Sequence, residues 1–328
     1  MKKRLQVNIM PIAFAALILL CGCGSEPTAP TATFEPFVDE APVATVSPNE
    51  QEQIVPIDAP LPDILIPEAS GVNVEANECA EIDYSNVADG YVMTRYIADT
   101  QKRLKVQVKG PTTTYTYNIT PYEWETFPLS DGNGEYKVSV YENVEDTKYA
   151  LVQSVTLQAE LKDEFAPFLR PNQYVNYAGA ENTIRLAAQL TAGLTEPLDK
   201  VAAVYSYVVE NISYDKHLAS TVKSGYLPVL DDVLEGKKGI CFDYAALMTG
   251  MLRSQSVPCK LVVGYAGETY HAWISVYSEK DGWIDSAIYF DGSAWKRMDP
   301  TFASSANESK EIMEYIGDGT NYTEKYLY

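Results

Sequence analysis

The chain has 328 residues, of which 46% are hydrophobic and 11% aromatic, enough for two ordinary domains and some non-globular sequence. Acidic residues outnumber basic ones by 45 to 25, so the formal net charge is -20. Because phosphate binding needs a concentrated basic face, this charge argues against nucleic acid as a partner.

The N-terminus has the pattern of an export signal. A basic start over residues 1–4 is followed by a short apolar run over 12–20, which is too short to span a membrane. The next residues, Leu20-Cys21-Gly22-Cys23, resemble a bacterial lipobox. The resemblance implies a lipoprotein signal peptide over residues 1–22 and a lipid on Cys23 that anchors the chain to the bacterial membrane. A plain secretory signal is the alternative, and both interpretations place the protein outside the cytoplasm.

Residues 23–80 are rich in proline, threonine, alanine and acidic residues, and no lysine or arginine occurs between Arg4 and Arg95. Such a segment repels itself and has little apolar surface to bury, so we expect a disordered stalk that holds the rest of the chain away from the membrane. The apolar triplet 64–66 leaves a second interpretation open, in which this part packs as an extended arm on the globular part.

Apolar, β-branched and aromatic residues alternate with polar ones over residues 81–162, as in Leu104-Lys105-Val106-Gln107-Val108. This period of two predicts strands, and glycine-containing turn sequences separate them. About six or seven strands without a helical stretch predict an all-β immunoglobulin-like sandwich. The segment holds no catalytic constellation, so we interpret it as a spacer or an adhesion surface.

Apolar residues change to a helical spacing after Pro167. Helices are expected at 184–194, 199–209 and 242–252, and strands at 261–263, 272–277 and 283–289. Asp199 is the expected cap of the second helix. Helices followed by an antiparallel sheet describe an α+β domain over residues 163–328.

Cys241 follows a glycine entry and directly precedes a helix-forming run. A thiol at a helix N-terminus faces unpaired backbone N–H groups and the positive end of the helix dipole, which favour the thiolate needed for attack on a carbonyl. Lys237 and Lys238 also favour the thiolate if they face the sulfur. His271, at the start of a strand, can act as a base and then as an acid, and Asp299 can fix the imidazole tautomer.

Three separated motifs resemble the transglutaminase-like superfamily. They are Gly239-Ile240-Cys241-Phe242-Asp243-Tyr244-Ala245, His271-Ala272-Trp273 and Asp299-Pro300-Thr301. The resemblance covers roughly the last 160 residues, and three motifs in the right order are more specific than any one alone. It implies a papain-like fold, with the nucleophile on a central helix and the histidine and aspartate on neighbouring strands. It also implies an oxyanion site, for which the backbone N–H of Cys241 and the hydroxyl of Tyr214 are the candidate donors.

The other cysteines and the second histidine have simpler interpretations. Cys259 lies at a strand entrance, where a buried and inert thiol is expected, and Cys79 ends the stalk as a free thiol. His217 is interpreted as a surface residue in a loop. With two histidines and no Cys-x-x-Cys pair, a metal site has little support, and we infer neither a metal nor a cofactor.

The leading hypothesis is a surface-anchored cysteine acyl-transfer enzyme that attacks peptide or glutamine-type amides through a Cys241 thioester. The same triad serves a protease, a deamidase or a transglutaminase, so the sequence leaves these branches open. The expected partners are a protein or peptide substrate at the cell surface and the membrane, reached through the N-terminal lipid. The alternative is a catalytically inactive binding or scaffolding lipoprotein that uses the same fold for protein recognition. A metal-dependent or solute-binding lipoprotein is disfavoured by the scarcity of histidine.

Overall fold

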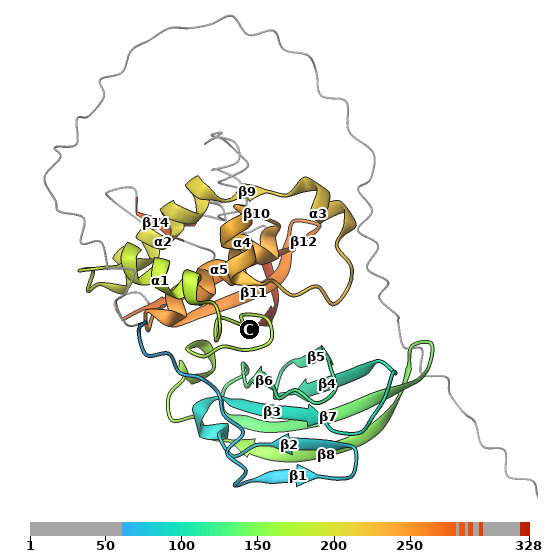
Figure 1. The fold of residues 1–328 in the computed structure, drawn as a ribbon. Coiled ribbons are helices and arrows are strands. Elements are labelled where there is room, and N and C mark those ends of the chain that lie inside the picture. The colour runs from blue at the N-terminus through green and yellow to red at the C-terminus, as the bar shows by residue number, and fades with distance from the viewer. Residues whose placement is uncertain (1–60, 280–281, 286–287, 291–294, 298–321) are drawn as a thin grey trace, which may run out of the picture.

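The computed structural model describes residues 61–279, 282–285, 288–290, 295–297 and 322–328. The expected signal peptide, the lipid site Cys23 and Asp299 lie outside these residues. Figure 1 shows a β region, which the chain forms first, beside a mixed region of helices and strands that follows it. Among the described helices, none has both the length and the apolar character needed to cross a membrane.

Two four-stranded antiparallel sheets make up residues 74–159, which we call the two-sheet region. One sheet has the strand order β1-β2-β3-β6 and the other β5-β4-β7-β8. The strands are β1 (Val74–Ala76), β2 (Ala80–Asp83), β3 (Tyr91–Tyr96), β4 (Leu104–Lys109), β5 (Thr114–Ile119), β6 (Glu125–Pro128), β7 (Gly134–Glu145) and β8 (Lys148–Ala159). A 3₁₀ turn, η1 (Val87–Asp89), precedes β3.

The alternation seen in the sequence produces the core of this region. In β5, Tyr115, Tyr117 and Ile119 are buried while the residues between them are exposed. Val106 of this sheet and Ile82 of the other sheet belong to the same buried cluster. The predicted strands are therefore present, whereas the immunoglobulin-like topology stays a prediction.

The folded part of the chain begins before residue 80, the predicted end of the stalk over residues 23–80. Strand β1 pairs antiparallel with β2, so the first sheet begins inside the predicted stalk. All three side chains of β1 are exposed, so the strand leaves no apolar alternation to read in the sequence. Before it, Leu61 and Ile64 pack against the buried core, as the extended-arm interpretation requires.

The second region is built of helices followed by an antiparallel sheet. Its helices are η2 (Ala166–Phe168), α1 (Glu181–Leu190), α2 (Pro197–Asn211), α3 (Lys216–Thr221), α4 (Leu230–Gly236) and α5 (Cys241–Ser254). Its strands are β9 (Ser213–Tyr214), β10 (Lys238–Gly239), β11 (Cys259–Ala266), β12 (Thr269–Ser278), β13 (Gly282–Asp285), β14 (Ile288–Phe290), β15 (Trp295–Arg297) and β16 (Tyr322–Leu327). The main sheet has the order β13-β12-β11-β16.

Helix α5 lies at the centre of this region. Every residue from Asp243 to Ser254 is buried, because α1, α2 and α4 pack around the helix and β11 and β12 also contact it (Figure 1). Such a helix shows little amphipathic pattern, since all of its sides face other parts of the protein. The expected α+β arrangement is therefore observed.

Two local predictions differ from the structure. Helix α2 begins at Pro197 with Glu196 as its N-cap residue, so Asp199 lies in the first turn and is not the cap. Proline suits this position because the first helical N–H has no partner in any case. The short helices α3 and α4 were not predicted, since six or seven residues are too few to show a helical period.

Arg253, near the end of α5, joins three separate segments. Its guanidinium donates to the backbone carbonyl oxygens of Cys259 at 2.8 Å, Arg170 at 2.8 Å and Tyr328 at 2.6 Å. The side chain is fully buried, and this burial lowers its pKa from the ordinary value. Through these bonds the helix is tied to the segment after the two-sheet region, to β11 and to the residue that follows β16.

Candidate active site

Cys241 is the first residue of α5, as the sequence predicts, and its side chain is half-buried. The first intrahelical bond runs from the Tyr244 N–H to the Ile240 carbonyl at 3.1 Å. The backbone N–H groups of residues 241–243 therefore have no acceptor within the helix. They form a set of donors that can stabilise a thiolate or an oxyanion beside the sulfur.

A buried carboxylate holds this first turn in place. Asp243 has no exposed surface, and its Oδ2 accepts a hydrogen bond from the Ile240 N–H at 2.7 Å. Its Oδ1 accepts from the hydroxyl of Tyr226 at 2.6 Å. Burial raises the pKa of the Asp243 carboxyl, and the two hydrogen bonds act in the opposite direction. Asp243 thus satisfies the Ile240 N–H, and the N–H groups of residues 241–243 remain as those without an acceptor inside the helix.

Gly239 is required by the close approach of Asp243. A Cβ at position 239 would lie 2.5 Å from the Asp243 Cβ and 3.0 Å from its Oδ2. We expect Gly239→Ala to destabilise the fold by roughly 1–3 kcal/mol, because the start of α5 must shift to make room. Gly236→Ala is the matched control, since a Cβ there meets nothing within 4 Å. Urea unfolding of both variants tests this, and equal stability of the two would contradict it.

The segment before Cys241 is also held by a short parallel pairing. Strand β10 pairs with β9, which places Tyr214 opposite Gly239, and the Asp215 N–H donates to the Gly239 carbonyl at 2.9 Å. Tyr214, the candidate oxyanion donor, thus lies alongside the segment that leads to Cys241 and is half-buried. Lys238 forms an ion pair with Asp215 at 3.4 Å, so its charge is directed to that carboxylate.

His271 lies on β12, one of the two strands that pack against α5, and is 5% exposed. Its ring stacks near Trp273, with ring centroids 6.2 Å apart. Across the sheet it pairs with Gly264, where a Cβ would lie 2.0 Å from the Thr323 carbonyl oxygen of β16. Only glycine therefore allows the three strands to approach at the histidine.

Tyr270 directly precedes His271 on β12, and its pKa is raised mainly by burial and also by nearby tyrosines and the Cys241 thiol. Helix α5, which begins at Cys241, packs against this strand. Asp299 lies outside the described residues, so its place in the triad stays a prediction.

A cluster of aromatic rings joins the two-sheet region to the start of helix α5. Tyr174, in the segment between η2 and α1, contacts Tyr117 of β5 at 5.6 Å and Phe242 at 5.4 Å between ring centroids. Tyr328 stacks on Tyr174 at 4.0 Å and nearly parallel, and lies 5.7 Å from Tyr115. Because Phe242 directly follows Cys241, this cluster places the two-sheet region close to the start of α5, and its role as a spacer or an adhesion surface stays a prediction.

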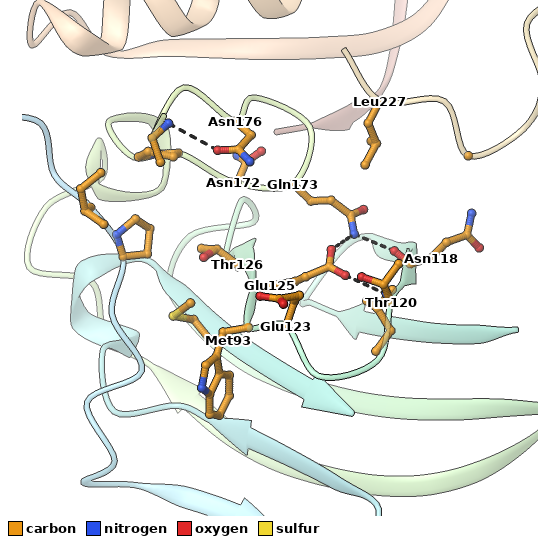
Figure 2. A pocket seen from close by; sticks show the side chains of 17 residues that line it. Met93, Asn118, Thr120, Glu123, Glu125, Thr126, Asn172, Gln173, Asn176 and Leu227 are labelled. Atoms are coloured by element: carbon orange, nitrogen blue, oxygen red, sulfur yellow. Dashed lines mark hydrogen bonds between the residues drawn. The ribbon is translucent and has the colours of Figure 1, made fainter. Parts of the chain in front are cut away.

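A cavity of about 570 Å³ lies at this junction (Figure 2). Its lining includes β3, the segment 118–126, residues 171–178, and Gly225 and Leu227 on either side of Tyr226. Inside it, the amide of Gln173 donates to a Glu125 carboxylate oxygen and to the Asn118 carbonyl. Burial raises the pKa of Glu125. None of the described residues that line this cavity is basic.

The remaining candidate residues lie apart from this site or carry no sign of reactivity. Cys259 is fully buried, and burial raises the pKa of its thiol to about 11, as expected for an inert thiol. Cys79 is half-buried just before β2 and forms no disulfide with the other described cysteines. His217 is exposed as expected, although it lies in α3 and not in a loop. Within the described part of the chain, no three side chains gather as metal ligands.

Comparison with known proteins finds a family model that matches part of the second region. Residues 184–300 match the family model described as the transglutaminase-like superfamily. This match supports a transglutaminase-like domain within these residues, with the papain-like fold that the motifs predict.

The individual proteins that match share low sequence identity with this chain. The uncharacterized protein YebA of Bacillus subtilis (strain 168) is 28% identical over 32% of this chain, and the match spans 17% of that protein. A solved structure from Cytophaga hutchinsonii, described as a "Putative Cysteine Protease", is 17% identical with a TM-score of 0.37, over 73% of this chain and 83% of that one. Red sea bream transglutaminase is 12% identical with a TM-score of 0.30, over 71% of this chain and 54% of that one.

Proposed function

We propose that the protein is a cysteine acyl-transfer enzyme that attacks a peptide or glutamine-type amide. The observation that carries the proposal is the position of Cys241 at the N-terminus of the central helix, beside the strand that holds the buried His271. A thiol in this position faces open backbone N–H donors and the positive end of the helix dipole. The transglutaminase-like domain gives both residues a common context.

In the proposed reaction, His271 takes the thiol proton and the Cys241 sulfur bonds to the substrate carbonyl carbon. The carbonyl electrons move to oxygen, where the Cys241 N–H, with the Tyr214 hydroxyl as a second donor, stabilises the negative charge. Collapse breaks the C–N bond, and the leaving amine takes the proton from the imidazolium. Asp299 would keep His271 in the tautomer that this exchange needs.

The resulting thioester is resolved by a second nucleophile. Water gives hydrolysis, as in a protease or deamidase, while an amine gives a new amide, as in a transglutaminase; in both cases His271 removes a proton from the nucleophile and the thiolate leaves. Access of water to the thioester decides between these outcomes.

Placement at the cell surface is part of the proposal. The basic and apolar start of the chain and the Cys23 motif support export and lipid attachment, and the acidic stretch before residue 61 supports a spacer between the lipid and the folded part. Metabolic labelling with a radioactive fatty acid tests this, because Cys23→Ala should remove the label from the membrane fraction.

One observation favours the alternative of an inactive binding protein. The Asp243 carboxylate lies in the same helical turn as Cys241 and, when ionised, opposes the formation of a thiolate there. An inactive protein of this kind would have an ordinary, slowly reacting thiol at position 241.

Acylation by p-nitrophenyl acetate separates the two functions. An active site should release p-nitrophenolate in a burst equal to the protein concentration and leave an acetyl thioester on Cys241, detected by peptide mass spectrometry. Cys241→Ala should show no burst, and Cys79→Ala should behave like the wild type. A burst of the same size in Cys241→Ala would remove the basis of the proposal.

A further inference from the structure

The loop between α3 and α4 sends one side chain to the start of the nucleophile helix. Tyr226 is half-buried, and its hydroxyl donates to Oδ1 of Asp243 at 2.6 Å. Its ring also meets that of Phe242 edge to face, with centroids 6.4 Å apart. Tyr226 thus contacts the two residues that directly follow Cys241.

We propose that Tyr226 is a positioning residue, which acts through Asp243 to hold the first turn of α5 so that its open N–H groups face the reacting carbonyl. The inference rests on the proposed function, because it assigns a role within that reaction. Tyr226 touches neither the sulfur nor the substrate in this account. Its effect passes through the Asp243 carboxylate, which accepts a hydrogen bond from the Ile240 N–H at 2.7 Å.

The Tyr226 hydroxyl is one of two hydrogen-bond donors to the buried carboxylate of Asp243. Asp243 is completely buried, and each of its oxygens has a donor, one from the backbone and one from Tyr226. Without the hydroxyl, Oδ1 is a buried acceptor with no partner, a state that is costly for a charged group. The carboxylate must then take up a proton or turn away, and either change weakens its hold on Ile240 and on the helix start.

The negative charge of Asp243 does not explain how the hydrogen-bonded pair of Asp243 and Tyr226 would assist the reaction. A negative charge in this turn opposes ionisation of Cys241, so its contribution to the site has to lie in the hydrogen bonds it makes. The same bonds are available to asparagine, whose oxygen can accept from Ile240 and whose amide can donate to the Tyr226 oxygen. Other charged groups that act on the pair are Asp215, which is itself paired with Lys238, and Asp232.

Two probes of the same thiol distinguish positioning from ionisation. Acylation by p-nitrophenyl acetate develops an oxyanion and needs the N–H donors, whereas alkylation by iodoacetamide needs only the thiolate. The ratio of the two rates at one pH therefore reports the alignment of the helix start, because the thiolate fraction cancels. Rates are measured on the full chain, with thermal unfolding recorded for each variant.

For Tyr226→Phe we expect this ratio to fall on the order of 10- to 100-fold. Asp243→Ala should show the same loss, and Asp243→Asn should keep a ratio close to that of the wild type. Tyr136→Phe is the matched control, because it removes a hydroxyl that donates to the Gly132 carbonyl at 3.0 Å within the two-sheet region.

Three outcomes would overturn the inference. One is an unchanged ratio in Tyr226→Phe, and another is a ratio as low in Asp243→Asn as in Asp243→Ala, which would assign the effect to charge. The third is an equal fall in Tyr136→Phe, which would assign it to general loss of stability. A wild type that is not acylated at all would instead sink the proposed function, and the inference with it.

Discussion

Replacing Cys241 by alanine is expected to abolish acyl transfer while leaving the fold intact. The thiol is the nucleophile of the acylation step in the proposed mechanism, so we expect a loss on the order of 10⁴-fold or more in the rate of acylation. The fold should survive because the side chain is small and half-buried and because alanine is favourable in a helix. The change is measured with p-nitrophenyl acetate, and circular dichroism and thermal unfolding check the fold.

His271→Ala should lose nearly as much, since the thiol then has no base and the leaving amine has no acid. Asp299→Asn should retain some activity, because the base remains and only its orientation is impaired. Cys79→Ala removes a half-buried thiol of the two-sheet region and is the control for both. Full activity in Cys241→Ala would show that the mechanism is wrong.

Replacing Arg253 by methionine is expected to destabilise the protein by roughly 3–5 kcal/mol. The guanidinium is fully buried and is the donor for three backbone carbonyls, so its removal leaves those oxygens without the hydrogen bonds it supplies. Methionine keeps most of the volume, which separates the loss of hydrogen bonds from the creation of a cavity.

Arg253→Lys should recover only part of the stability, because one ammonium group cannot reach in the three directions that the planar guanidinium covers. Arg95→Met is the matched control: its partner is Glu81, both side chains are partly exposed, and such a pair contributes about 1 kcal/mol or less. The midpoints of urea unfolding report the differences. Similar midpoints for Arg253→Met and Arg95→Met would contradict the role given to Arg253.

The parts of the fold that were predictable are those with a period or a motif. Alternation located the strands of the two-sheet region, and the motifs placed Cys241 at a helix start and His271 on a strand beside that helix. Strand β1 was not predicted because its side chains are all exposed and so show no apolar alternation.

The supporting residues of the site were harder to find. Asp243 stands three residues after the N-cap position Ile240, where an acidic side chain can accept the N-cap N–H, and this capping signal was present in the sequence. Tyr226 lies in an irregular loop, and no spacing connects it to Cys241. Arg253 appears in the sequence as a charged residue near a helix end, and its burial follows only from the packing of distant segments.

Cys241 is proposed to be a thiolate nucleophile paired with His271, and the pH dependence of its alkylation by iodoacetamide tests this pairing most directly. Labelling at Cys241, Cys79 and Cys259 is measured by mass spectrometry in the wild type and in His271→Ala. We predict selective labelling of Cys241 below about pH 7 that is lost in the variant. Cys259, whose pKa is raised to about 11 by burial, should stay unlabelled in both. Labelling of Cys241 only near the ~8.5 of a free thiol, unchanged in His271→Ala, would contradict the account and favour a binding protein.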